Sequence, residues 1–283
     1  MSEGERQEAS TDQWGAAAEH WAQAAEKDEV GAAADAAKWM LKAADLQSGE
    51  RVLELACGAA RIGLQAAAAV GPEGSVLCSD LSEEMVKVAA ERMVRLDVSN
   101  VETRVLDAQD LDLDEQFDAA LCRFGYMLMP DPLQALRESA RVLRPGGRLV
   151  LAVWGEAQDN PWLLQILQAV MSHLSAPPPE PGAPGPFSLG DPARLRDLLD
   201  QAGFTNLEVE EVETTQVYDS LDAWWEKILN VGGPLKAILD PLPEADLNAI
   251  RDAALSSGQQ FVTDDGSAVF PAVVLGAKAR KPA

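Results

Sequence analysis

Two carboxylates stand at or near the ends of two apolar segments in the first third of the chain. Glu54 lies within the otherwise apolar run 52–56, and Asp80 directly follows the run 75–79. A β-α-β unit with this pattern brings the carboxyl ends of its strands to one edge of a parallel sheet, where nucleosides bind. A carboxylate at Asp80 can accept hydrogen bonds from both hydroxyls of a ribose. The pattern therefore predicts a nucleoside site.

The turn between the two segments indicates which nucleoside derivative binds. Dinucleotide-binding turns follow G-x-G-x-x-G, and within residues 56–61 (ACGAAR) only Gly58 agrees. Glu54 would repel a pyrophosphate but can pair with an ammonium group. S-adenosylmethionine has an α-amino group, a ribose and an adenine without phosphate, so electrostatics favour it over NAD. Alternatively, Glu54 is a surface acid or interacts with a helix dipole, although an acid inside an apolar strand is costly without a partner.

The composition excludes several classes of partner. The chain has 46 acidic and 23 basic residues, a net charge of −23, which repels phosphate backbones and disfavours nucleic acids and anionic membrane surfaces. No segment approaches the ~20 apolar residues of a membrane span, and the polar N-terminus is unlike a signal peptide. Three cysteines without metal-ligand spacing and only two histidines argue against a metal site and fit a cytoplasmic location.

Strand and helix signals alternate along most of the chain, as in a parallel sheet with helices on both faces. We therefore predict an α/β fold with a Rossmann-like, doubly wound, mostly parallel sheet and an antiparallel last strand. Helix N-caps are expected at Ser82, Asp131 and Asp191, the last two preceding a proline. The predicted strands are 52–56, 75–79, 101–106, 117–122, 147–154, 207–215 and 268–279.

Other regions interrupt this alternation. Residues 12–45 are rich in Ala and predict one or two helices, so we assign residues 1–45 to an N-terminal helical cap. Residues 46–283 form the expected main domain. Two insertions are expected in it, at about 155–190, which contains a Pro/Gly-rich loop, and at about 219–260, which is helical.

Five segments resemble, in order and at workable spacing, the motifs of class I S-adenosylmethionine-dependent methyltransferases, in particular the small-molecule group of ubiquinone and menaquinone biosynthesis. The resemblance covers about residues 50–155. It implies a methyltransferase with S-adenosylmethionine as its cofactor. The segments are 52–58 (VLELACG), 79–85 (SDLSEEM), 107–111 (DAQDL), 117–126 (FDAALCRFGY) and 141–149 (RVLRPGGRL).

The resemblance also implies roles for individual residues. Asp80 is expected to bind the ribose hydroxyls, and Glu54 is expected to interact with the α-amino group. Asp107 would accept a hydrogen bond from the adenine amino group. Arg123 would flank the methionyl portion, unless it pairs with a nearby acid instead. The expected cofactor-binding residues are Trp21, Glu54, Ala56, Gly58, Asp80, Leu81, Met85, Asp107, Ala108, Arg123 and Phe124.

The chain departs from the family pattern in the turn after the first strand. Positions 56 and 60, which are glycines in the family, are Ala56 and Ala60 here. Each alanine adds a methyl group near the path of the cofactor and is expected to restrict the backbone to negative φ. The two added methyl groups are therefore expected to affect the affinity for the cofactor.

The residues that act on the methyl acceptor lie outside the strongest motifs. His20 is the candidate general base, because the N-terminal helix can close over the site in this family, although a structural histidine is the alternative. Tyr126, Met129, Tyr218 and Trp224 are the expected acceptor-binding residues, with core packing as the alternative. A base is needed only if the acceptor loses a proton during transfer.

The sequence therefore predicts transfer of a methyl group to a small lipophilic or aromatic acceptor at carbon, oxygen or nitrogen. The alternative is a protein of the same fold that binds the cofactor without transferring a methyl group. An oxidoreductase is disfavoured by Glu54 and the missing glycines. Nucleic-acid methylation is disfavoured by the charge and because residues 123–126 (RFGY) lack an Asn/Asp-Pro-Pro-Tyr signature. The oligomeric state is left open.

Overall fold

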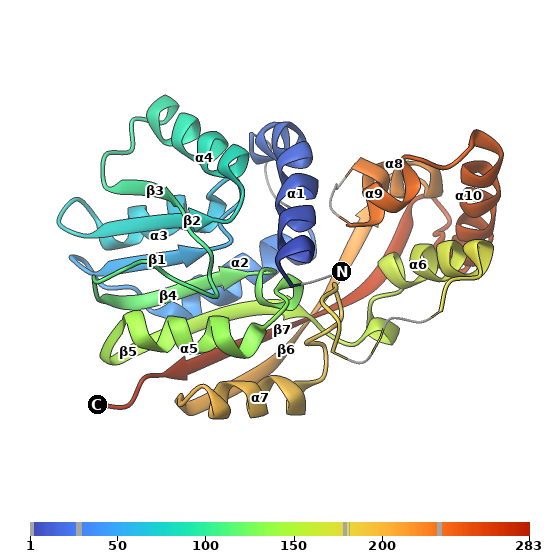
Figure 1. Cartoon of the computed structure of the whole chain (residues 1–283). Coiled ribbons are helices and arrows are strands. Elements are labelled where there is room, and N and C mark those ends of the chain that lie inside the picture. The colour runs from blue at the N-terminus through green and yellow to red at the C-terminus, as the bar shows by residue number, and fades with distance from the viewer. Residues whose placement is uncertain (1–2, 27–29, 178–179, 181, 231–233) are drawn as a thin grey trace.

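The computed structural model describes residues 3–26, 30–177, 180, 182–230 and 234–283. Within them, seven strands form one sheet in the order β3-β2-β1-β4-β5-β7-β6 (Figure 1). β7 is antiparallel to β5 and β6, and the other pairs are parallel, so the predicted Rossmann-like sheet with an antiparallel last strand is confirmed. The strands are β1 (Arg51–Leu55), β2 (Ser75–Asp80), β3 (Val101–Val105), β4 (Phe117–Arg123), β5 (Leu143–Trp154), β6 (Thr205–Tyr218) and β7 (Ala268–Arg280).

The register of the central strands brings the predicted motifs to one edge. β1 lies between β2 and β4, and Leu55 at its end pairs with Ser79 on one side and Cys122 on the other. The turn after β1, Asp80 at the end of β2 and Arg123 at the end of β4 therefore meet at the carboxyl edge of the sheet. Parallel sheets bind ligands at this edge.

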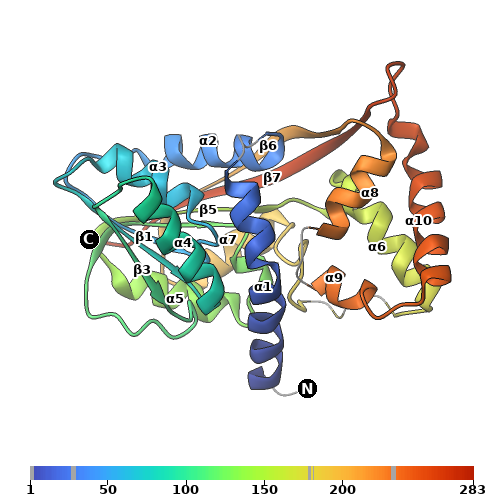
Figure 2. The ribbon, with the colours of Figure 1, turned by 90° about the horizontal axis from the view of Figure 1, so that it is seen from above.

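Helices cover both faces of the sheet. α2, α3 and α4 pack on strands of the sheet, as do α5 and α7. In Figure 2, α2 and α3 lie on one side of the strands and α5 lies on the other. Ser82, Asp131 and Asp191 cap α4, α5 and α7 through their side-chain oxygens, as predicted. The helices are α1 (Glu3–Ala25), α2 (Ala32–Ala44), α3 (Arg61–Val70), α4 (Glu83–Arg95), α5 (Pro132–Val142), α6 (Pro161–Leu174), α7 (Pro192–Gln201), α8 (Leu221–Asn230), α9 (Pro234–Leu239) and α10 (Glu244–Gly258).

The long strands β6 and β7 extend past the other strands of the sheet and lead to a second helical group. There α6, α8, α9 and α10 gather beside the main body (Figure 2), and α10 packs on both α6 and α8. The expected helical insertion before the last strand is present, except that residues 231–233 lie outside the described part. Residues 27–29 of the expected cap, and residues 178, 179 and 181 of the other insertion, are also outside it.

α1 stands against the main body, where it packs on α4 and contacts α9. This position places it over the carboxyl edge of the sheet. Of the helices in the described ranges, none is both long and apolar enough to cross a membrane.

Candidate cofactor-binding site

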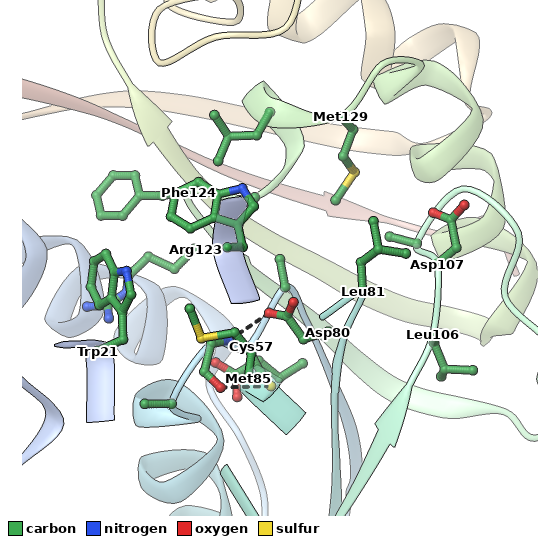
Figure 3. Close-up of a pocket in the computed structure, with 18 of the residues that line it drawn as sticks. Trp21, Cys57, Asp80, Leu81, Met85, Leu106, Asp107, Arg123, Phe124 and Met129 are labelled. Atoms are coloured by element: carbon green, nitrogen blue, oxygen red, sulfur yellow. Dashed lines mark hydrogen bonds between the residues drawn. The ribbon is translucent and has the colours of Figure 1, made fainter. Parts of the chain in front are cut away.

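A pocket opens at the carboxyl edge of the sheet, and every predicted cofactor-binding residue lines it. In Figure 3 the Asp80 carboxylate lies between Trp21 and Arg123 on one side and Leu81 and Met129 on the other. Segments separated by about a hundred residues therefore meet there, as the sequence motifs require. The predicted residues that line the pocket are Trp21, Glu54, Ala56, Gly58, Asp80, Leu81, Met85, Asp107, Ala108, Arg123 and Phe124.

Glu54 on β1 accepts two hydrogen bonds from within the protein and also lines the pocket. Its Oε2 accepts hydrogen bonds from the Gly63 N–H at 2.8 Å and from Cys78 Sγ at 3.3 Å. Gly63 is the third residue of α3, whose N-cap residue Ala60 makes no side-chain capping bond. Glu54 thus caps α3 from the neighbouring strand, which agrees with the helix-dipole alternative. Burial raises the pKa of this 3% exposed carboxyl to about 7.

Asp80 joins the two turns that flank the pocket. Its Oδ2 accepts from the Gly58 N–H at 2.9 Å and its Oδ1 from the Ser82 N–H at 3.1 Å. Burial raises the pKa of Asp80 above its usual value, although both backbone hydrogen bonds oppose this shift. An ionised carboxylate has about four acceptor sites, so these two bonds leave capacity for the hydroxyl groups of a ligand.

The turn after β1 is strained at two alanines. Ala56 and Ala60 have φ of 50° and 52°, close to the 52° of Gly58 between them. The expectation that alanine keeps this backbone at negative φ is therefore wrong, because the turn imposes the left-handed conformation on all three residues. Each non-glycine residue in that region costs about 1–2 kcal/mol. Residues with strained backbones of this kind are frequent at ligand-binding sites, where the surrounding structure holds them in the unfavourable conformation.

Gly125 makes room for the methyl group of Ala56. A Cβ built on Gly125 would lie 2.7 Å from the Cβ of Ala56 and 2.7 Å from Cys122 Sγ. Real Cβ atoms are essentially never this close. The alanine at position 56 is therefore accommodated by a glycine from the segment that follows β4.

The residues at the end of β4 form an aromatic wall. Phe124 has φ of 61°, and its ring stacks on Trp154 with centroids 4.3 Å apart and planes 13° apart. Trp154 in turn meets Trp162 edge-on at 4.9 Å. Arg123 donates from Nη1 to the Ala33 carbonyl at 2.8 Å, which connects the pocket to the start of α2.

The opposite side of the pocket is built from the ends of β2 and β3. Asp107 accepts through Oδ1 from the Gln109 N–H at 2.9 Å and so closes a tight turn. The Leu106 N–H donates to the Asp80 carbonyl at 3.0 Å, while the side chain of Met85 is buried below. This side combines a carboxylate with apolar surface, as an adenine ring and its amino group require.

The structure places His20 away from the pocket. Trp14, Trp21 and Ala25 of α1 line it, whereas His20 is exposed and is not part of the lining. Adjacent helical residues point about 100° apart, so the face of α1 that presents Trp21 to the pocket turns His20 toward solvent. Its candidate role as a base is not supported by this position.

Three of the four expected acceptor-binding residues are core residues instead. Tyr126 is 1% exposed and its hydroxyl lies 2.6 Å from Ser139 Oγ. Trp224 is fully buried and donates from Nε1 to the Trp162 carbonyl at 2.7 Å. Tyr218 is buried as well. Their large apolar rings are used in packing, and only Met129 lines the pocket.

Sequence reasoning missed part of the lining. Half of the missed residues lie inside a recognised motif (Cys57, Gln109 and Gly125) or directly next to one (Ala59 and Leu106), so closer attention to the motifs could have found them. Trp14 carried its own signal, because it precedes Trp21 by seven residues and shares its helical face. Within the described residues, no group of three His, Cys, Asp or Glu is placed to hold a metal ion. The missed residues are Trp14, Ala25, Cys57, Ala59, Arg61, Leu106, Gln109, Gly125, Leu128 and Pro130.

Comparison with known proteins agrees with this geometry. Residues 46–180 match the family described as a methyltransferase domain. The demethylmenaquinone methyltransferase of Listeria monocytogenes serotype 4a is 40% identical over 142 residues, 48% of this chain and 59% of that protein. The chain therefore spans about three-fifths of that relative.

A second relative and a solved structure extend the agreement. The demethylmenaquinone methyltransferase of Staphylococcus carnosus is 31% identical over 61% of this chain and 75% of its own length. The crystal structure of YcgJ from Bacillus subtilis shares the fold, with a TM-score of 0.61, 20% identity, and coverage of 88% of this chain and 98% of that one. The chain belongs to the class I S-adenosylmethionine-dependent methyltransferases.

Proposed function

We propose that the protein binds S-adenosylmethionine in this pocket and transfers its methyl group to a small lipophilic or aromatic acceptor. The observation that carries the proposal is the convergence of Glu54, Asp80 and Asp107 on a single pocket without a glycine-rich phosphate turn. Three carboxylates suit a ligand that is cationic and rich in hydroxyl and amino donors. They would repel a dinucleotide.

The two central acids would act at different parts of the cofactor. Asp80 lies at the end of β2, held by two backbone N–H groups, and would accept the ribose hydroxyls with its remaining lone pairs. The Oε2 atom of Glu54 accepts hydrogen bonds from Gly63 of α3 and from Cys78. Glu54 also lines the pocket. It would provide negative charge for the α-ammonium group, directly or through water. A charge-assisted hydrogen bond of this kind contributes about 1.5–3 kcal/mol.

Methyl transfer from a sulfonium is an in-line displacement, so positioning and the exclusion of water can supply most of the catalysis. Part of the pocket lining is apolar and includes Phe124, Leu128, Met129 and Pro130. Such a surface favours a lipophilic acceptor. Since both relatives are named demethylmenaquinone methyltransferases, a demethylmenaquinone-like compound is the first acceptor to test.

The second candidate is a protein that binds the cofactor but transfers no methyl group. The left-handed Ala56 and Ala60 favour it, because their methyl groups stand where the family has glycine. Under this alternative the pocket holds S-adenosylmethionine as a structural or regulatory ligand.

Calorimetry with S-adenosylhomocysteine tests binding. Asp80→Ala should weaken affinity at least ~10-fold, since two charge-assisted hydrogen bonds are lost. Asp112→Ala is the matched control, because this exposed acid is outside the pocket lining. Unchanged affinity in a folded Asp80→Ala variant would remove Asp80 from the site.

Transfer is tested with cofactor labelled in its methyl group and a panel of quinones, phenols and amines. Label in an acceptor supports the enzyme, and the atom that carries it distinguishes carbon, oxygen and nitrogen transfer. Tight binding without transfer to any acceptor would favour the second candidate.

A further inference from the structure

Arg92 on α4 is a buried cation that the proposed chemistry does not use. It is 9% exposed and does not line the pocket. Its Nη1 donates to the Ala59 carbonyl at 2.9 Å, and its Nη2 donates to the Ala25 carbonyl at 3.1 Å. Within the described part of the chain, its hydrogen-bond partners are thus carbonyl oxygens rather than a carboxylate. Burial lowers the pKa of Arg92, although the charges of Glu26 and Glu54 oppose this shift, and a buried guanidinium is costly unless it is hydrogen-bonded.

The two carbonyls belong to elements that are far apart in the sequence but share the pocket. Ala59 is in the strained turn after β1, and Ala25 is the last residue of α1. Both residues line the pocket. Arg92 therefore joins the cofactor turn and the helix above it with one planar group, whose fixed N–H fork sets the spacing of the two carbonyls.

The end of α1 depends on cations from other elements. The last carbonyls of a helix lack intrahelical partners, and basic side chains can satisfy them. α1 has no basic residue in its last turn. Arg61 at the start of α3 donates to the Ala24 carbonyl at 2.5 Å, and Arg92 donates to Ala25. Both guanidinium groups also oppose the partial negative charge at this helix end.

One turn before Ala25, Trp21 faces the pocket with an unsatisfied donor. Its Nε1–H is buried and, among the described residues, has no hydrogen-bond acceptor. A buried donor without a partner costs about 1–3 kcal/mol. Its presence beside a pocket therefore indicates that a ligand atom accepts this hydrogen bond. Trp21 therefore lies one helical turn before the residue whose carbonyl Arg92 binds.

We infer that Arg92 is a positioning residue for the cofactor site, which joins α1 to the cofactor turn and thereby holds the Trp21 N–H against the bound ligand. The ligand group that this donor fits is an anionic or carbonyl oxygen, such as a carboxylate. The inference rests on the proposed function, because it takes S-adenosylhomocysteine as the probe.

Arg95→Met supplies a matched control. Arg95 lies on the same helix and pairs with Glu26 just beyond α1. Both side chains are half exposed, and neither is part of the pocket lining among the described residues. If Arg92 only attached α1 to α4, loss of the Arg95 pair would act in the same direction. We expect Arg95→Met to leave affinity for S-adenosylhomocysteine within about twofold of the wild type, as for exposed ion pairs.

Calorimetry on Arg92→Met and Trp21→Phe tests the coupling. We expect each variant to bind S-adenosylhomocysteine about tenfold more weakly, because each loses the same hydrogen bond to the ligand. The double variant should be no weaker than about the weaker single variant, since the two residues act through one contact. Additive losses of about a hundredfold would overturn the inference.

Hydrogen exchange supplies a readout that general destabilisation does not reproduce. In Arg92→Met the amides of residues 14–25 should exchange at least tenfold faster, while those of β1 and β4 keep their protection. Arg92→Lys keeps the charge but reaches both carbonyls less well, so it should recover part of the affinity. If Arg92→Met does not fold, Arg92→Lys takes its place in the double-variant comparison.

The outcomes separate this inference from the proposed function. If the wild type fails to bind S-adenosylhomocysteine, the proposed function fails, and the exchange of α1 in the unliganded protein still tests the connection made by Arg92. If the wild type binds and Arg92→Met binds equally well with unchanged exchange in α1, the inference is wrong while the proposed function stands.

Discussion

The Glu54 carboxylate accepts a hydrogen bond from the Gly63 N–H at 2.8 Å, so one acid joins the central strand to the first turn of α3 at the floor of the pocket. A side chain at Gly63 would prevent this approach. Its Cβ would lie 2.2 Å from Cys78 Sγ and 2.5 Å from Glu54 Oε2.

Gly63→Ala should therefore lower the free energy of unfolding by about 1–3 kcal/mol, the usual cost of overpacking a core. Chemical denaturation measures this change in the free energy of unfolding. Gly185→Ala is the control, because a Cβ there meets nothing within 4 Å and the backbone is not left-handed. Removing the thiol in Gly63→Ala/Cys78→Ala should recover part of the loss. Equal stability of Gly63→Ala and the wild type would contradict the assigned contact.

Ala60→Gly should stabilise the protein. Relief of the left-handed alanine is worth about 1–2 kcal/mol, and the greater freedom of glycine in the unfolded chain offsets about 0.4–1 kcal/mol. We expect a net gain of up to about 1.6 kcal/mol, measured by denaturation. Ala59→Gly, next to it and without a positive φ, should be destabilising instead. The same sign for both variants would contradict the backbone strain.

Glu54 should make stability depend on pH. Its folded-state pKa is raised from 4.5 to about 7 by burial, so the folded protein holds this proton more tightly than the unfolded chain. The contribution is fully favourable below about pH 4.5 and is lost as the pH rises through 7. Glu54→Gln, which can still accept from Gly63, should become more stable relative to the wild type as the pH rises from 5 to 8.

Cofactor affinity should show the opposite dependence on pH. An ammonium group pairs only with the ionised form of Glu54, so affinity for S-adenosylhomocysteine should rise from pH 6 to pH 8 as the proton is released. Calorimetry in buffers of different ionisation enthalpy measures the released proton. In Glu54→Gln the dependence should flatten. An equally steep profile in that variant would assign the titration to another group.

His20→Ala should retain wild-type turnover, because His20 is exposed and lies off the face of α1 that lines the pocket. The comparison is Trp21→Phe, one residue along the helix and in the lining, which should lose cofactor affinity. The rate with labelled cofactor is the measurement for both. A large loss of turnover with unchanged cofactor affinity in His20→Ala would support His20 as the general base.

The sequence by itself determined the sheet and the residues along its carboxyl edge. Strand patterns are local, and acids such as Glu54 and Asp80 can be placed by their distance from a strand end. The parallel register then brings the strand ends together, so residues on four separate segments could be assigned to one pocket before any contact was known.

Only the tertiary structure decided which way the remaining side chains face. The rotation of α1 about its axis, which turns Trp21 inward and His20 outward, is set by packing against α4 and by the Arg92 hydrogen bonds. Burial of Trp224 depends on Trp162, which is 62 residues away in the sequence. The left-handed Ala56 likewise depends on Gly125. Such orientations are sums of long-range contacts, and no local pattern of residue types encodes them.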